Sequence, residues 1–348
     1  MTTNSRVMQA LVVEPGPPQP EKDAGSRAIV DLVDGLTALG YRASLAVENN
    51  PKQLERAIAS KPDLVVLSRP GTFLRNAEKF ARSECQLLYF PHDLHSMRIR
   101  TGAEISSQFS STAAGALEIL ERKCITSADN SLFPTESEAI WAREMCFGAR
   151  ASAINYYWFN TPTSDYRDRP GCRIVFVGSK DHAPNSDGVM WFLSDMWPHI
   201  LSERPDTELV LVGDWQDVVD TNSSERVSVH KGLNDQHLDH LLQSCHVAIA
   251  PLRFGAGMKR KTVHYFSQGL PVVSTSFGAQ GLEKPLEEFS AAVISDEAPS
   301  FTQSVIDLIS SSSGVERMSE QAGQLIAKHF SFDRYLGKLT SALAQATL

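Results

Sequence analysis

The chain has 348 residues, of which 42% are hydrophobic and 21% charged, and its formal net charge is −8 at pH 7. This length predicts about two domains, and the apolar content is sufficient for two cores, which excludes a disordered or fibrous protein. The acidic balance argues against nonspecific nucleic-acid binding and against a polybasic membrane anchor. The expected partners are therefore small molecules and not nucleic acids.

Membrane and redox signals are absent from the sequence. No stretch approaches the roughly 18 consecutive apolar residues of a membrane-spanning helix, and the N-terminal segment lacks the apolar core of a signal peptide. We therefore expect a cytoplasmic protein without a membrane span. The scattered cysteines include no Cys-x-x-Cys pair, so we expect reduced thiols and no zinc site. They are Cys85, Cys124, Cys146, Cys172 and Cys245.

The first half of the chain alternates short apolar runs with amphipathic stretches, which is typical of βα units around a parallel sheet. The predicted strands are 7–14, 42–47, 63–68, 86–90, 131–134 and 151–156. The predicted helices are 26–39, 52–60, 72–82, a long helical region that ends near residue 127, and 136–145.

A second alternating series follows a segment, 159–171, that has two prolines and no apolar period. Its predicted strands are 173–178, 208–212, 227–230, 247–250, 271–274 and 291–295, and its predicted helices are 187–203, 236–244, 259–268, 299–310, 314–328 and 332–343. We predict an α/β protein with two doubly wound, Rossmann-like domains that face a central cleft. The expected parts are a first domain (1–160), a linker (161–172), a second domain (173–330) and a final helical segment (331–348).

A glycine loop with closely spaced cations follows the predicted strand 247–250. It contains Gly255, Gly257, Lys259 and Lys261, and a helix is predicted to begin there. Glycine lets the backbone approach a ligand, and a helix N-terminus offers unpaired N–H groups and a positive dipole end. Because cations are unfavourable at a helix N-terminus, their presence favours a bound anion such as a diphosphate. The alternative, that the glycines form a turn and the cations a solvated helix start, stays open.

A second candidate is the loop His92-Asp-Leu-His95, which comes directly after a predicted strand. Functional residues are concentrated in such loops. We expect one of the two histidines to be functional, with His92 favoured, and Asp93 to orient a histidine or cap a turn. Trp191 and Trp197 have the spacing of a core face, and we assign them no chemistry.

With these motifs in view, the chain resembles glycosyltransferase family 4, the large group 1 family of GT-B fold. The similarity is strongest from residue 173 to 283 and weaker in the first half. The second-half motifs are Phe176-Val-Gly178-Ser179, Pro184-Asn185-x-Asp187, Trp197-Pro198, Leu211-Val-Gly213, His230-Lys-Gly232-Leu, the lysine and glycine loop, and Gly278-Ala-Gln-Gly281. The first-half motifs are Asp23-Ala-Gly25-Ser-Arg27, His92-Asp-Leu-His95 and Thr135-Glu-Ser137-Glu.

This resemblance implies transfer of a sugar, with retention of configuration, from a nucleoside diphosphate sugar to a glycan or other acceptor. It places the donor on the second domain and the acceptor on the first, and assigns His92, His95 and Lys261 to catalysis. It assigns the donor diphosphate to Gly178, Ser179, Arg253, Gly257, Lys259, Lys261 and His264, the nucleobase to Lys231, Gly232 and Leu233, and the acceptor-side loop to Gly25 and Ser26. It also implies that the last helix crosses back to the first domain.

One departure concerns the Glu-x7-Glu pattern that many family members carry. The equivalent positions here are Ala256 and His264, which puts the ribose contact and the donor preference in question. Two alternative functions stay open. One is a catalytically silent GT-B partner of another transferase, and the other is an enzyme that epimerises a nucleotide sugar. We expect no cofactor and no metal, because the cations can neutralise the leaving group and no Asp-x-Asp pair follows a strand. A complex with other glycan-assembly enzymes is a further expectation.

Overall fold

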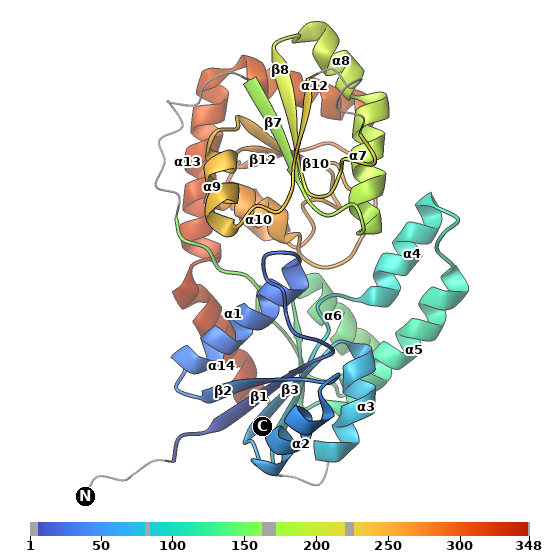
Figure 1. Cartoon of the computed structure of the whole chain (residues 1–348), viewed down its shortest axis with the longest axis vertical. Coiled ribbons are helices and arrows are strands. Elements are labelled where there is room, and N and C mark those ends of the chain that lie inside the picture. The colour runs from blue at the N-terminus through green and yellow to red at the C-terminus, as the bar shows by residue number, and fades with distance from the viewer. Residues whose placement is uncertain (1–5, 81–83, 162–171, 220–225, 347–348) are drawn as a thin grey trace, which may run out of the picture. The chain divides into compact units, whose positions relative to one another are not determined.

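A computed structural model describes residues 6–80, 84–161, 172–219 and 226–346 (Figure 1). The chain divides into two compact units. The first comprises Met1–Ala103, Ser107–Trp158 and Phe332–Leu348, and the second Glu104–Ser106 and Phe159–Ser331. Apart from its two end residues, the predicted linker 161–172 lies outside the described residues.

The first unit contains a six-stranded parallel sheet in the order β2-β1-β3-β4-β5-β6. Its strands are β1 (Gln9–Glu14), β2 (Arg42–Val47), β3 (Leu64–Ser68), β4 (Gln86–Phe90), β5 (Asn130–Phe133) and β6 (Ala151–Ala153). Strand order reverses between β1 and β3, and ligands of such sheets bind beyond the carboxyl ends of the strands at this switch point. The loops after β1, β3 and β4 are therefore the functional edge of this unit.

Helices pack against this sheet and begin at recognisable capping residues. They are α1 (Ala24–Ala38), α2 (Pro51–Ala59), α3 (Pro70–Phe80), α4 (His95–Ile105), α5 (Ser111–Ser127), α6 (Glu136–Met145) and α14 (Phe332–Gln345). Asp23, Asn50, Ser110 and Thr135 accept backbone N–H groups at the starts of α1, α2, α5 and α6. The predicted long helical region that ends near residue 127 is in fact two helices, because Ser110 caps a new helix.

The last helix, α14, belongs to the first unit although it follows the whole of the second in sequence. It packs against α1, β5 and β6, so the last helix of the chain lies beside the first (Figure 1). Asn130 Nδ2 donates a hydrogen bond of 2.8 Å to the carbonyl of Ala342. Gly35 of α1 lies under Tyr335, where an added Cβ atom would stand 2.6 Å from Tyr335 Cε1.

The second unit contains a six-stranded parallel sheet in the order β12-β11-β10-β7-β8-β9. Its strands are β7 (Cys172–Val177), β8 (Thr207–Val212), β9 (Val227–His230), β10 (Val247–Ala250), β11 (Val272–Ser274) and β12 (Ala292–Ile294). The switch point lies between β7 and β10. The prediction of two doubly wound parallel sheets is therefore confirmed.

The helices of the second unit are α7 (Ala183–Asp195), α8 (Trp197–Glu203), α9 (Asp235–Gln243), α10 (Arg260–Ser267), α11 (Glu283–Glu288), α12 (Ala298–Ser310) and α13 (Ser312–His329). The prediction of a single helix over 187–203 is wrong, because the segment forms two helices that are separated at Met196. Proline 198 has no N–H for a bond to residue 194, and its ring would clash with that carbonyl in a continuous helix. Trp197 is buried in the core of this unit, and Trp191 packs against it.

Two further findings concern the whole described part of the chain. No helix in it is both long and apolar enough to cross a membrane. Among the same residues, no group of three or more His, Cys, Asp or Glu side chains is placed to hold a metal ion.

Candidate functional site

Gly178 follows β7 at the switch point of the second unit and lies against two polar side chains. Its N–H donates to Val212 O at 2.9 Å, and its carbonyl accepts Trp215 Nε1 at 2.9 Å. A Cβ atom on Gly178 would stand 2.6 Å from Asn185 Nδ2 and 2.8 Å from Lys261 Nζ. Because residue 178 is glycine, the Lys261 ammonium can lie directly against the backbone there.

Lys261, in the first turn of α10, is held by Asn185 of α7. Its Nζ donates to Asn185 Oδ1 at 2.6 Å and lies 3.9 Å from the centre of the Phe176 ring. Burial, with a smaller contribution from the neighbouring charge of Lys259, holds the pKa of Lys261 well below its usual value. An anion bound here would oppose both effects and favour the charged lysine. Lys261 is therefore a group whose protonation an anionic ligand would favour.

Lys259 connects the two glycine loops next to the start of α10. Its Nζ donates to the carbonyls of Ala256 and Gly257, both at 2.8 Å, and to Gln280 Oε1 at 3.2 Å. Gly257 has φ of 69°, which favours glycine. In the second loop, Gly278 lies so close to β10 that a Cβ would stand 2.3 Å from Ala250 O. The lysine pair and both loops thus form one cluster at the carboxyl edge of the sheet.

Arg253 is engaged by α7. Its Nε and Nη2 donate to the two carboxylate oxygens of Asp187 at 2.8 and 2.5 Å, and its guanidinium lies 5.4 Å from the centre of the Trp191 ring. The sequence assigned Arg253 to the diphosphate. In this structure its fork geometry is directed at a carboxylate, and Asp187 is a partner that the sequence analysis did not assign.

The predicted nucleobase segment, Lys231 to Leu233, follows β9. Gly232 has φ of 68°, and Lys231 Nζ lies 3.8 Å from Asp214 Oδ1 as an exposed ion pair. Ser179, the neighbour of Gly178, accepts the Asp181 N–H on its hydroxyl oxygen at 3.2 Å. These residues lie in the loops that follow β7 and β9.

His264 is paired with a carboxylate from another helix. Its Nε2 lies 2.7 Å from Oδ1 of Asp239 on α9, and its ring stacks on Phe159 with 5.3 Å between ring centres. Burial lowers the pKa of His264, so the imidazole is neutral near pH 7. A carboxylate is thus present beside the position where the resemblance led us to expect glutamate. Asp239 was not predicted, because its only signal is a three-dimensional contact.

In the first unit, four side chains meet at the carboxyl ends of β1, β3 and β4. The buried carboxylate of Glu14 accepts the Ser68 hydroxyl and lies 3.5 Å from Arg69 Nε and 3.6 Å from His92 Nε2. Arg69 and His92 have φ of 59° and 73°, an uncommon conformation for residues with a side chain. Strain of this kind is concentrated at functional sites. Burial lowers the pKa of His92.

Gly25 lies beside this cluster at the start of α1. A Cβ on Gly25 would stand 2.9 Å from Arg69 Nη2 and 3.2 Å from His92 Nδ1. Ser26 is occupied by capping, because its N–H and hydroxyl donate to Asp23 at 2.7 Å each. The structure therefore brings Gly25 and His92 together, whereas the Ser26 hydroxyl serves the helix start.

His95 lies beside Asp93, the carboxylate that we expected to orient a histidine or cap a turn. His95 Nε2 lies 3.2 Å from Asp93 Oδ1, and Arg98 donates to the other oxygen of Asp93. Burial lowers the pKa of His95 to about 4. Both loop histidines are thus neutral near pH 7. Glu14 and Arg69 were missed by the sequence analysis, although Glu14 is the one charge that ends an otherwise apolar strand.

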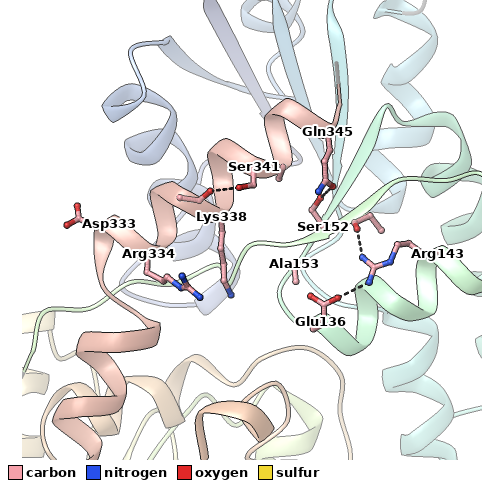
Figure 2. A pocket seen from close by; sticks show the side chains of 12 residues that line it. Glu136, Arg143, Ser152, Ala153, Asp333, Arg334, Lys338, Ser341 and Gln345 are labelled. Carbon is pink, nitrogen blue, oxygen red and sulfur yellow. Dashed lines mark hydrogen bonds and ion pairs between the residues drawn. The ribbon is translucent and has the colours of Figure 1, made fainter. Parts of the chain in front are cut away.

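A separate hollow in the first unit has a volume of about 520 Å³ and is lined by α6, β6 and α14 (Figure 2). Arg143 reaches across it to donate to Glu136 at 2.8 Å and to the carbonyl of Ala151 on the edge strand at 2.7 Å. Its lining contains none of the predicted site residues. Arg143 therefore covers the backbone of an edge strand, which limits pairing with other chains.

Part of the chain matches a known protein family. Residues 171–311 match the family described as Glycosyl transferases group 1. A curated relative, the uncharacterized 44.6 kDa protein in the cps region of Klebsiella pneumoniae, is 25% identical over 174 residues, which are 48% of this chain and 44% of that protein. The chain thus spans less than half of that relative.

Solved structures resemble the whole chain. Sucrose-phosphate synthase from Thermosynechococcus elongatus has a TM-score of 0.79 at 13% identity and covers 98% of this chain and 99% of its own. HepE of Anabaena, in complex with UDP and glucose, has a TM-score of 0.68 at 14% identity over 97% and 99%. A trehalose-6-phosphate protein from E. coli bound with UDP-2-fluoro glucose has a TM-score of 0.64 at 12% identity over 98% and 99%. The fold is GT-B, and the residues that match the group 1 glycosyltransferase model lie in the second unit.

Proposed function

We propose that the protein is a family 4 glycosyltransferase that moves a sugar, with retention of configuration, from a nucleoside diphosphate sugar to a glycan or small-molecule acceptor. The observation that carries this proposal is the cluster of Gly178, Asn185, Lys259 and Lys261 at the switch point of the second unit. The match of residues 171–311 to group 1 glycosyltransferases supports it.

The lysine cluster suits the chemistry of the leaving group. Breaking the bond between the anomeric carbon and the diphosphate leaves negative charge on the phosphate oxygens, and preorganised cations and N–H groups stabilise that charge. Lys261 and the N-terminus of α10 supply both within one turn of helix. Lys259 holds the glycine loop in place, because its Nζ donates hydrogen bonds to the carbonyls of Ala256 and Gly257. We propose that this set works without a metal ion.

We propose that the nucleoside lies along the loop after β9, with Asp239 at its ribose. Position 264 lacks the expected glutamate, but Asp239 is fixed beside it by the 2.7 Å contact with His264. A carboxylate accepts hydrogen bonds from a ribose diol. UDP is the first nucleotide to test, because HepE and the pneumococcal O-GlcNAc transferase GtfA were solved with it.

The first unit would supply the histidine loop for the transfer step. His92 and His95 are both kept neutral by burial, so either can donate or accept a hydrogen bond at a sugar hydroxyl near pH 7. Gly25, beside His92, would belong to the loop that meets the acceptor.

The test is a thermal-shift and sugar-release assay of the purified chain against UDP, GDP, ADP, TDP, CDP and their sugars. Wild type is compared with Lys261→Ala and with Lys284→Ala, which removes an exposed lysine of α11. Stabilisation by one nucleotide and slow release of sugar from its donor, both lost only in Lys261→Ala, would support the transferase.

A catalytically silent partner module is the alternative that Ala256 and His264 favour. It predicts stabilisation by a nucleotide without sugar release, even with candidate acceptors present. An epimerising enzyme would instead convert the nucleotide sugar without transferring it, which product analysis distinguishes. No response to any nucleotide would contradict all three functions.

A further inference from the structure

Two buried carboxylates of the first unit hold the backbone on either side of His95. Glu121 of α5 and Glu138 of α6 are 0% and 1% exposed. Glu138 Oε1 accepts the N–H of Leu94 at 2.9 Å. Both oxygens of Glu121 lie 3.3 Å from the N–H of Ser96, and Oε2 also accepts the Ser96 hydroxyl. The peptide groups that join Asp93 to Leu94 and His95 to Ser96 are therefore both held by side chains from other helices.

This arrangement determines where α4 begins and how the His95 ring is presented. His95 is the first residue of α4, and a carboxylate that meets N–H groups in a first helical turn is favoured by the helix dipole. Glu138 is held in turn by Thr135, whose hydroxyl donates to Oε2 at 2.8 Å. With the backbone held at Leu94 and Ser96, the His95 ring lies with its Nε2 3.2 Å from Asp93 Oδ1.

Burial of the two carboxyl groups is costly unless hydrogen-bond donors meet them. An unpaired carboxylate in an apolar interior is strongly disfavoured, and apolar side chains of similar size often stabilise a core better than buried charges do. The groups that face Glu121 are Ser96 and the backbone of His95 on α4, Asp93 in the loop, Tyr89 of β4 and Cys124 on its own helix. None of these carries a positive charge, so the partners of Glu121 are the loop's own donors.

We propose that Glu121 and Glu138 are positioning residues that hold His95 in the geometry of the transfer step. This inference rests on the proposed function for the step itself, but the clamp is a property of the first unit and can be measured without it. The two carboxylates act through the backbone of Leu94 and Ser96 and do not touch the sugar.

The test compares Glu121→Ala and Glu138→Ala, which remove the acceptor oxygens, with one matched control on each helix. The control Glu118→Ala lies about one turn before Glu121 and loses bonds to Arg100 and Arg122. The control Glu136→Ala loses a bond to Arg143. We expect the two clamp variants to release sugar about tenfold more slowly or worse, with KM changed less than about threefold, because small misplacements of a reacting group slow the chemical step. The controls keep the wild-type rate.

The second readout is NMR titration of His95, assigned by the signal that disappears in His95→Gln. In wild type and in both controls, His95 stays neutral from pH 5 to 8, since its pKa is about 4. In the clamp variants, the ring gains water and titrates within that range. If a clamp variant does not fold, Ser96→Ala, which removes one hydroxyl and leaves both carboxylates, is measured in its place.

The two readouts separate the inference from the proposed function. Wild-type protein that neither binds a nucleotide nor releases sugar would refute the function, while the titration of His95 would still test the clamp. The inference is overturned if the clamp variants leave His95 neutral, or if the control variants lose as much activity as the clamp variants do.

Discussion

The ammonium of Lys261 and the side-chain oxygen of Asn185 are 2.6 Å apart, although 76 residues separate them in the chain. Asn185 Nδ2 also donates to the Ser179 carbonyl at 2.8 Å, so one amide ties α10 to the loop after β7. This contact makes the lysine part of a rigid site. It is the basis for the first prediction.

Asn185→Ala should destabilise the protein by about 1–3 kcal/mol, because it removes two hydrogen bonds made by a buried side chain. It should also weaken nucleotide binding about tenfold, since Lys261 loses its orientation. Urea unfolding and calorimetric titration measure the two effects. A double-mutant cycle with Lys261→Ala should show a coupling of about 0.5 kcal/mol or more in binding. Strictly additive effects would show that the contact has no role in the site.

Gly178→Ala should abolish nucleotide binding, because the new methyl group would occupy the space between Asn185 Nδ2 and Lys261 Nζ, 2.6 and 2.8 Å away. Gly115→Ala on α5 is the matched control, since a Cβ there meets nothing within 4 Å and alanine favours a helix by about 0.5–1 kcal/mol. Thermal shift with and without nucleotide distinguishes them. Normal binding by Gly178→Ala would mean that the ligand lies elsewhere.

The packing of α14 on α1 predicts opposite effects for two glycines. Gly35→Ala should destabilise the protein by about 1–3 kcal/mol, because its Cβ would stand 2.6 Å from Tyr335 Cε1. Gly337→Ala, on α14 itself, should stabilise it slightly, since no atom lies within 4 Å of the added carbon. Deletion of residues after 330 should destabilise the protein as a whole. A truncated chain with an unchanged melting temperature would show that α14 is dispensable.

The buried Glu121 predicts a specific pH dependence. Burial raises its pKa to about 7 from an ordinary value of 4.5, so the folded state retains a proton that the unfolded state has lost. Its contribution to stability is therefore present below pH 4.5 and is lost as pH rises toward 7. Between pH 5 and 8, the free energy of unfolding of wild type should fall by about 2–3 kcal/mol relative to Glu121→Gln.

The pKa of His95 has the opposite effect on the free energy of unfolding over part of this pH range. Its pKa of about 4 means that the folded state excludes a proton that the unfolded state binds below about pH 6.5, so its contribution grows as pH rises. The comparison with Glu121→Gln isolates the carboxylate from this effect. A difference between the two proteins that is constant with pH would contradict the raised pKa of Glu121.

Much of the fold could be predicted from the periodicity of the sequence. The strands β2, β4, β9 and β10 begin and end at the predicted residues, because alternating or continuous apolar residues are a local signal. The predicted helix 187–203 failed where Pro198 breaks the hydrogen-bond ladder at Met196. The short α11 was missed, because six residues give too little period to recognise.

The candidate site was predictable where it consists of one continuous segment. The loop with Lys259 and Lys261 does begin a helix beside a switch point, and Gly178 does lie against Lys261. The partners Asp187, Asp239 and Glu14 were not predicted, because each meets its basic neighbour through the fold and not through sequence spacing. Arg253 and Asp187 are 66 residues apart, and no local pattern pairs them.

The most direct measurement is calorimetric titration with a nucleoside diphosphate and the matching monophosphate, starting with UDP and UMP. The diphosphate should bind at least about tenfold more tightly than the monophosphate, which corresponds to about 1.4 kcal/mol. This difference should disappear in Lys261→Ala and persist in Lys284→Ala. Equal affinities for the two nucleotides, or a difference that survives in Lys261→Ala, would contradict a diphosphate site at the start of α10.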